Sequence, residues 1–162
     1  MKIAIAVDHA GMPLLETVTD AVKANGHEAV VVGWSGDYPD IALAVSREVA
    51  NGDADRGILV CGSGAGVAIA ASKVDGVRAA CAHDHYTAAQ CVTHDDVNVL
   101  CLGARVVGSN VATDLVDAFL SVEFSNEDRH VRRLAKVALI EREGLHADIG
   151  SAAPLDTFPA TA

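Results

Sequence analysis

Short runs rich in Val, Ile, Leu and Ala alternate, along most of the 162-residue chain, with segments whose apolar residues recur at helical spacing. This alternation is typical of a parallel sheet wound with helices. The sequence therefore predicts an α/β fold, a Rossmann-like open parallel five-stranded sheet with helices on both faces and a C-terminal helix. The expected strands are Lys2 to Val7, His27 to Val32, Arg56 to Val60, Val77 to Ala82 and Asn98 to Leu102.

The segments between the strands carry helix boundary signals. Asn-Gly pairs at residues 25–26 and 51–52 are expected to end the first two helices, and Pro39 suits the first turn of the second. Ser125 followed by Asp128 predicts a capping box for the last helix. Helices are expected over 12–24, from about 38 to 51, and over 66–73, 85–93, 109–120 and 127–142.

The chain length suits one domain with its own core. Helical periodicity stops near residue 145, and the remaining segment contains small residues and two prolines. We therefore predict a single domain over residues 1–143. The tail over residues 144–162 is expected to be flexible or to pack on a partner subunit.

Composition excludes several partner classes. Twelve Lys and Arg against twenty-two Asp and Glu give a formal charge of −10, which would repel the phosphates of nucleic acid. The apolar run at the N-terminus is too short for a signal peptide or a membrane span, so we expect a cytoplasmic protein with no membrane contact. The four cysteines form no Cys-x-x-Cys pair, so reduced thiols and no zinc site are expected.

The loop after the third strand reads "CGSGAG", from Cys61 to Gly66. Glycines here let backbone N–H groups turn toward an anion or an oxyanion at the start of a helix, although close helix–strand packing explains them equally well. A thiol at Cys61 would feel the positive end of the helix dipole, which favours the thiolate and suits a nucleophile or a general base. A buried strand-end cysteine is the alternative there, and it is the expected role of Cys81, Cys91 and Cys101.

Polar side chains follow or precede other strands. Asp8 and His9 in "DHAG" suit sugar hydroxyls and acid–base chemistry near neutral pH, or else a helix cap. His94, Asp95 and Asn98 in "THDDVN" precede the fifth strand, where a histidine alone is more often a surface loop residue. These two segments are therefore candidates for the site.

Two further clusters contain basic residues or histidines. Arg129 and Arg133 share one face of the last helix and suit a phosphate, or else a solvated face paired with Glu127. The "HDH" at residues 83–85 has no third candidate ligand nearby, so no metal site is predicted.

Together these motifs resemble those of ribose-5-phosphate isomerase type B and its relatives, which include galactose-6-phosphate isomerase. The resemblance covers about residues 1–143 in order. The matching stretches are "DHAG" from Asp8, "DYPD" from Asp37, "ILVCGSGAGVAIAASK" from Ile58 followed by "GVRAA", "HDDVNVLCLGARVVG" from His94 and "RHVRR" from Arg129.

The resemblance implies an enzyme that interconverts an aldose phosphate and a ketose phosphate through a cis-enediolate, with no metal or organic cofactor. Cys61 would be the base, because Val67 stands where the family's other form has a glutamate. Ser63 takes the place of the family's hydroxyl residue, and His94 would assist ring opening with Asp8 at the ring hydroxyls. Backbone N–H groups of Gly62, Gly64, Ala65 and Gly66 would hold the enediolate oxygen, Tyr38 would line the pocket, and His9, Arg105, Arg129 and Arg133 would contact the phosphate.

The resemblance further implies a homodimer with sites between its subunits, or a tetramer built from such dimers. Asp95 departs from the family pattern, because it replaces an asparagine amide, which can donate a hydrogen bond, with a carboxylate, which cannot. The expected substrate is ribose 5-phosphate. A hexose 6-phosphate such as galactose or allose 6-phosphate, or a tetrose phosphate, is the alternative, and a nucleotide-binding module is the alternative from another class.

Overall fold

A computed structural model describes residues 1–150 of the chain. Its internal contacts divide the chain into two units, Met1–Asn126 and a second that begins at Glu127. The part of the predicted tail beyond residue 150 lies outside the described residues.

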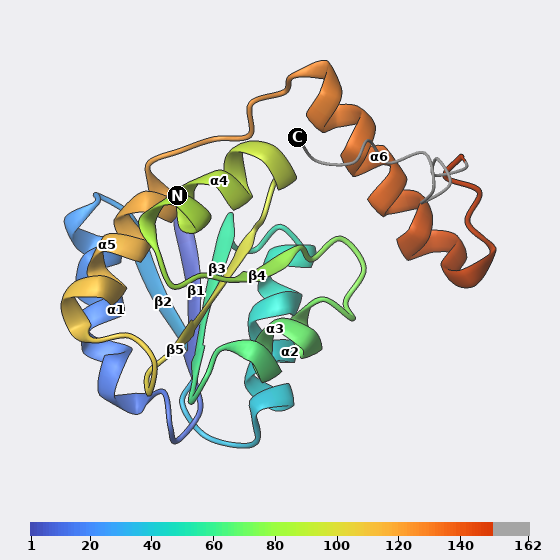
Figure 1. The fold of residues 1–162 in the computed structure, drawn as a ribbon. Helices are drawn as coiled ribbons and strands as arrows, with labels where there is room; N and C mark the ends of the chain where they lie inside the picture. The colour runs from blue at the N-terminus through green and yellow to red at the C-terminus, as the bar shows by residue number, and fades with distance from the viewer. Residues whose placement is uncertain (151–162) are drawn as a thin grey trace, which may run out of the picture. The chain divides into compact units, whose positions relative to one another are not determined.

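The first unit is built on a five-stranded sheet in which every neighbouring pair is parallel (Figure 1). The strands lie in the order β2-β1-β3-β5-β4. The predicted fold class is therefore confirmed. The strands are β1 (Lys2–Val7), β2 (Glu28–Gly33), β3 (Arg56–Cys61), β4 (Ala79–Cys81) and β5 (Val99–Gly103).

Strand β4 is shorter than the sequence predicted. Val77 is not paired in the sheet, because its N–H donates to Val74 O in a turn. Only Ala79, Ala80 and Cys81 pair with β5. The strand therefore ends at Cys81, one residue before the predicted end.

Helices cover both faces of the sheet (Figure 1). One face carries α1 (Leu15–Ala24), which a 3₁₀ turn at Met12–Leu14 precedes, together with α4 (His85–Asp95) and α5 (Ser109–Leu120). The other face carries α2 (Tyr38–Ala50) and α3 (Ala65–Ala71). Both faces of the central strands are thus buried, as their nearly continuous apolar sequences require.

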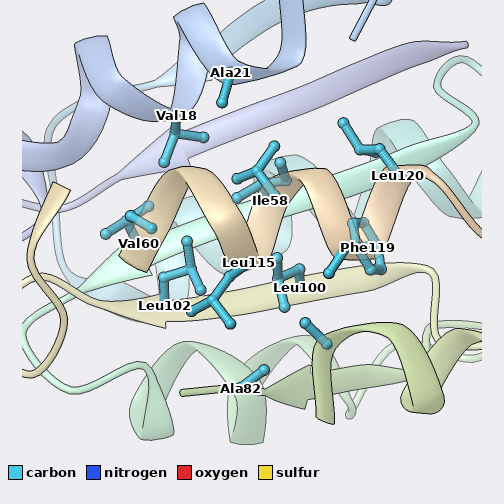
Figure 2. Packing of buried hydrophobic residues seen from close by; sticks show 14 of the residues in the cluster. Val18, Ala21, Ile58, Val60, Ala82, Leu100, Leu102, Leu115, Phe119 and Leu120 are labelled. Atoms are coloured by element: carbon cyan, nitrogen blue, oxygen red, sulfur yellow. The ribbon is translucent and has the colours of Figure 1, made fainter. Parts of the chain in front are cut away.

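The larger core lies between the sheet and α1, α4 and α5 (Figure 2). Ile58 from β3 and Leu100 from β5 pack there with Leu115 and Phe119 from α5, all fully buried. Burying a side chain of this size stabilises the fold by about 1.5–3 kcal/mol. This packing fixes the neighbouring central strands whose ends carry the candidate site.

The second unit contains α6 (Asp128–Glu143) and a 3₁₀ turn at Gly144–His146. The predicted capping box at Ser125 is wrong, because the N-cap of α6 is Glu127 and no side chain caps it. The N–H of Ser125 instead donates to Thr93 O, which holds that residue at the end of the first unit. A capping box does form at the start of α2, between Asp37 and Asp40.

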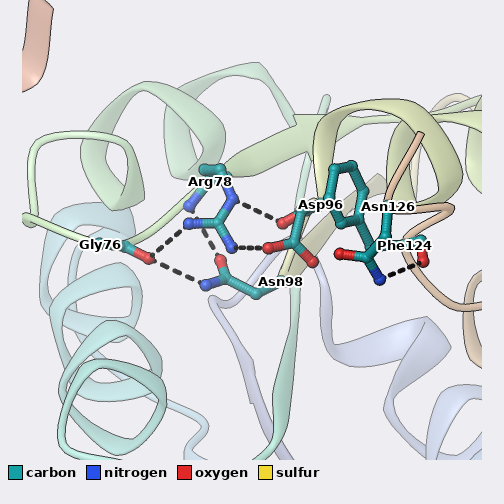
Figure 3. Close-up of polar contacts among 6 residues, drawn as sticks. All are labelled: Gly76, Arg78, Asp96, Asn98, Phe124 and Asn126. Atoms are coloured by element: carbon teal, nitrogen blue, oxygen red, sulfur yellow. Dashed lines mark hydrogen bonds and ion pairs between the residues drawn. The ribbon is translucent and has the colours of Figure 1, made fainter. Parts of the chain in front are cut away.

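A polar network fixes the chain where it enters β5 (Figure 3). The Arg78 guanidinium donates to both the backbone oxygen of Asp96, at 2.6 Å, and its carboxylate, at 2.7 Å. Asn98 accepts from Arg78 N–H at 2.8 Å and donates to Gly76 O at 2.9 Å. Asn98 therefore closes a structural turn at the amino edge of the sheet.

Among residues 1–150, no helix has both the length and the apolar character needed to cross a membrane.

Candidate active site

The strand order reverses between β1 and β3, because the chain winds outward from β1 to one edge and from β3 to the other. In open parallel sheets, ligands bind beyond the carboxyl ends of the strands at such a point. A pocket of about 450 Å³ lies here. It is lined by Asp8, His9, Ala10, Tyr38, Cys61, Gly62, Ser63, Gly66, Arg105 and Val106.

Most of the residues that the sequence singled out thus meet in one pocket, although they come from four separate segments. Ala10 and Val106 also line it, and sequence reasoning missed both. Neither carries a chemical group that would mark it. Only their positions, beside His9 and Arg105, could have indicated them.

Cys61 is the last residue of β3, and the residue is only 5% exposed. The N–H of Gly64 donates to its Sγ at 3.1 Å. Gly64 has a φ of +82°, a left-handed conformation that glycine adopts without strain. The turn therefore aims a backbone donor at the thiol, where it can stabilise negative charge.

Another backbone N–H group of the loop has a different acceptor. The N–H of Ala65 donates to Ser63 Oγ at 3.3 Å. Two of the N–H groups predicted to hold an enediolate oxygen, those of Gly64 and Ala65, thus donate to side chains of the loop itself. Sequence reasoning did not foresee that the thiol itself would be one of them.

Two residues from neighbouring strands support this loop. A Cβ placed on Gly103 of β5 would lie 2.6 Å from Ser63 C, so a larger residue could not pack there. Cys81, at the end of β4, donates to Ser63 O at 3.6 Å. The loop backbone therefore rests directly on β4 and β5.

Cys81 ends β4 and packs against the core beside α2 and α3, but it is only partly buried and contacts the loop, whereas Cys91 and Cys101 are buried as expected. Burial is the main cause that raises the pKa of the Cys81 thiol, and nearby Cys61 adds to it. Burial also raises the pKa of Cys91, to about 11. The strand-end position of Cys81, which it shares with Cys61, was the signal that could have marked it.

The structure shows the capping role of Asp8 and also places the residue in the pocket. Its Oδ1 accepts from the N–H groups of Ala10 and Gly11, at 2.8 and 2.9 Å, so it caps the turn after β1. The residue is buried but lines the pocket. Within residues 1–150 its Oδ2 has no hydrogen-bond partner, which leaves that oxygen for a ligand hydroxyl.

Tyr38 and Arg105 contact the two ends of the glycine loop. A Cβ on Gly66 would come within 3.1 Å of the Tyr38 ring, so the ring packs over that glycine. The Arg105 side chain lies against Gly62, and its backbone N–H donates to Gly62 O at 3.0 Å. A positive and an aromatic group thus flank the thiol.

His94 and Asp95 lie elsewhere in the first unit. They form the last turn of α4, rather than a loop, and precede the amino end of β5. Cys61 pairs in register with Gly103 at the carboxyl end of β5. The amino end of that strand, which His94 and Asp95 precede, is about 13 Å away. His94 also contacts Gln90, with 2.7 Å between its Nδ1 and the amide nitrogen. Within one chain the sheet separates His94 from the thiol.

Arg129 and Arg133 belong to α6 in the second unit, and both are exposed. Arg129 pairs with Glu127 at 2.9 Å and donates to His130 Nε2 at 3.1 Å. The ion pair considered as the alternative to phosphate binding is thus present for Arg129. A phosphate at this arginine would compete with that carboxylate.

The histidines at residues 83–85 have separate contacts. His83 Nε2 lies 3.7 Å from Cys81 Sγ, and His85 Nδ1 lies 2.9 Å from Asp114 Oδ1. In the part of the chain that the structure describes, no three His, Cys, Asp or Glu side chains are grouped to hold a metal ion.

Known proteins match the chain over most of its length. The model of a family described as Ribose/Galactose Isomerase matches residues 3–137. Ribose-5-phosphate isomerase B of Escherichia coli is 39% identical over 87% of this chain and 97% of that protein. D-erythrulose-4-phosphate isomerase 2 of Mycolicibacterium smegmatis is also 39% identical, over 87% of this chain and 97% of its own length.

A solved structure agrees with these matches. The crystal structure of ribose-5-phosphate isomerase B from Mycoplasma genitalium with bound ribulose 5-phosphate superposes with a TM-score of 0.81 and 40% identity. The match covers 88% of this chain and 97% of that one.

Proposed function

The chain belongs to the ribose/galactose isomerase family, and we propose that its reaction is the interconversion of ribose 5-phosphate and ribulose 5-phosphate. As a member of this family it is a sugar-phosphate isomerase acting between aldose and ketose. The observation that carries the proposal is the position of Cys61 in one pocket with Asp8, Tyr38 and Arg105. The predicted cytoplasmic location stays a prediction.

In the proposed mechanism the Cys61 thiolate removes the proton from carbon 2 of the open-chain aldose. The electrons of that C–H bond form the carbon 1–carbon 2 double bond, and the negative charge moves to oxygen 1 of a cis-enediolate. The thiol then returns the proton to carbon 1, the hydroxyl proton of oxygen 2 passes to oxygen 1, and carbon 2 becomes the ketone. Loop N–H groups of Gly62 and Gly66 would stabilise the enediolate, an effect worth about 10²–10³ in rate per donor in other enzymes.

Side chains around the thiol have matching roles. Asp8 Oδ2 would accept a sugar hydroxyl, and Ser63 would hydrogen-bond to the reacting oxygens. Tyr38 would pack against the sugar, while His9 and Arg105 would hold the phosphate, which guanidinium groups bind well. The pocket suits an anion even though the whole chain is acidic.

We propose that His94, Asp95, Arg129 and Arg133 act from a second copy of the chain. The length of β5 supports this for His94. The residue lies near the amino end of that strand and the thiol lies near its carboxyl end, about 13 Å away, so His94 cannot reach the thiol of its own chain. A two-fold homodimer would place the amino end of β5 in each chain close to the pocket of its partner. Two such dimers could pair into a tetramer.

Mixed dimers test this arrangement. We expect a dimer of one Cys61→Ala chain and one His94→Ala chain to recover about half of the wild-type kcat, because one of its two sites then has both groups. The matched control combines Cys61→Ala with Asp8→Ala, two residues of the same pocket, and should recover nothing. Differently tagged chains would be co-expressed, purified as mixed dimers and assayed. A Cys61→Ala/His94→Ala dimer no more active than its parents would contradict the shared site.

The substrate is tested by comparing kcat/KM across aldose phosphates of four, five and six carbons. We expect ribose 5-phosphate to be preferred, by about tenfold or more, because one misplaced hydroxyl or methylene costs about 1–3 kcal/mol. D-erythrulose 4-phosphate belongs in the panel in the reverse direction, since a relative is named for it. Higher kcat/KM for a tetrose or hexose phosphate would overturn the choice of ribose.

The same sugar phosphates can be compared in the wild-type protein and in an Asp95→Asn variant. If its carboxylate faces the sugar, Asp95→Asn should change the ranking of substrates, because an amide can donate to a sugar oxygen. An unchanged ranking would exclude that role. A nucleotide-binding module, the alternative from another class, would bind ATP and turn over no sugar phosphate.

A further inference from the structure

The peptide unit that joins Ser63 to Gly64 lies between two thiols. Its carbonyl accepts a hydrogen bond from Cys81 Sγ at 3.6 Å, and its N–H donates to Cys61 Sγ at 3.1 Å. The two contacts are at opposite ends of one amide group. A continuous path of hydrogen bonds therefore runs from Cys81 to Cys61.

This peptide packs closely against two strands. A Cβ on Gly103 would lie 2.6 Å from Ser63 C, and one on Gly64 would lie 2.6 Å from Cys81 Sγ. Both glycines thus let the peptide approach β4 and β5 closely. This close approach brings the Ser63 carbonyl within reach of the Cys81 thiol.

A donor at the carbonyl of an amide strengthens the hydrogen bond made by its N–H, because linked hydrogen bonds polarise one another. Such a donor requires Cys81 to keep its proton. Burial raises the pKa of Cys81, and charge on nearby Cys61 raises it further. Cys81 therefore stays protonated in the state in which Cys61 is ionised.

We propose that Cys81 is a positioning residue for the reaction, which donates its thiol proton to Ser63 O and so holds the Gly64 N–H on the sulfur of Cys61. This inference rests on the proposed role of Cys61 as the base. Cys81 itself touches no substrate in this account. Its contribution passes entirely through the backbone of the loop.

A disulfide between the two thiols does not account for their proximity. Strand β5 lies between β3 and β4, so their backbones are two strand spacings apart, about 9–10 Å. Disulfides require Cα atoms within about 7 Å. The two thiols are therefore connected by hydrogen bonds through the peptide between them, and not by a covalent bond.

Other titratable groups also face these thiols. The pocket around Cys61 contains Asp8, His9, Tyr38 and Arg105. Cys101 pairs in register with Cys81, and His83 Nε2 lies 3.7 Å from the Cys81 sulfur. Substitutions at Cys81 leave all of these groups in place.

Two substitutions separate the donor from the packing of the side chain. Cys81→Ala removes the donor, and Cys81→Ser keeps one in a side chain of similar size. We expect Cys81→Ala to lower kcat about two- to fivefold with little change in KM, as a weak S–H donor would. Cys81→Ser should recover most of this loss. Cys91→Ala, which removes a thiol from the other face of the sheet, is the matched control and should leave kcat unchanged.

A second readout does not depend on isomerisation. The rate at which iodoacetamide alkylates Cys61, followed by peptide mapping at fixed pH, reports its thiolate content. We expect this rate to fall in Cys81→Ala by about the same factor as kcat and to recover in Cys81→Ser. If no sugar phosphate is turned over, the proposed function fails, but the alkylation rates still test the connection.

Two results would overturn the inference. One is a Cys81→Ala protein with unchanged kcat and an unchanged rate of Cys61 alkylation. The other is a Cys81→Ser protein as impaired as Cys81→Ala, which would mean that packing, and not the donor, is what matters.

Discussion

Replacing Cys61 with alanine is expected to lower kcat for isomerisation by about 10²–10⁴-fold, the range that a positioned acid or base contributes. Val67, in the helix after the loop, supplies no carboxylate that could replace the thiol. Sugar-phosphate binding should survive, since the phosphate and hydroxyl contacts of the other residues remain. Kinetics with ribose 5-phosphate would measure the loss, and titration calorimetry would measure binding.

Cys91→Ala provides the control, because Cys91 is a buried thiol that lies outside the pocket. It should retain nearly full activity. Full activity in Cys61→Ala would exclude the thiol as the base, and loss of both activity and binding would indicate that the substitution disrupts the pocket itself.

The second large effect is expected from Gly103→Ala, a residue that does not line the pocket. The new methyl group would meet Ser63 C at 2.6 Å and Ser63 O at 2.7 Å, so the loop must move away from β5. Displacing the loop would move the proposed donors to the enediolate together with the Gly64 N–H on Cys61. We expect kcat to fall by about 10²-fold or more, as removal of one oxyanion donor does elsewhere.

Gly108→Ala is the matched control, since a Cβ at that glycine meets nothing within 4 Å. It should change kcat little. Circular dichroism and thermal melting would check that Gly103→Ala still folds. A folded Gly103→Ala protein with wild-type kcat would show that the loop does not need β5 for its geometry.

Much of the fold could be predicted because its signals are local. Apolar runs, Asn-Gly stops and Pro39 mark the sheet and most helices within a few residues. The start of α6 could not be predicted in this way. Ser125 looks like a cap in sequence, but a backbone hydrogen bond to Thr93, which is distant in the chain, holds it outside the helix.

Part of the pocket could also be predicted from local sequence signals. Asp8 follows β1 and Cys61 ends the adjacent β3, so a parallel sheet brings them together. The strand-end position of Cys81 marks it as a candidate, but its contact with the loop could not be predicted, because that contact depends on which strands are neighbours. Strand order is set by packing of the whole sheet, and only that order places β4 and β5 under the loop.

The contact between Gly103 and Ser63 has a consequence for how such a protein can change its substrate. The backbone geometry of the loop is imposed from the interior of the sheet, whereas the sugar would be contacted by side chains that project from other segments. Substitutions at those side chains, with Asp95 among them if it acts from a second copy, are therefore expected to leave the geometry of the loop unchanged. A scaffold divided in this way can change which sugar it binds while it keeps the same proposed chemistry.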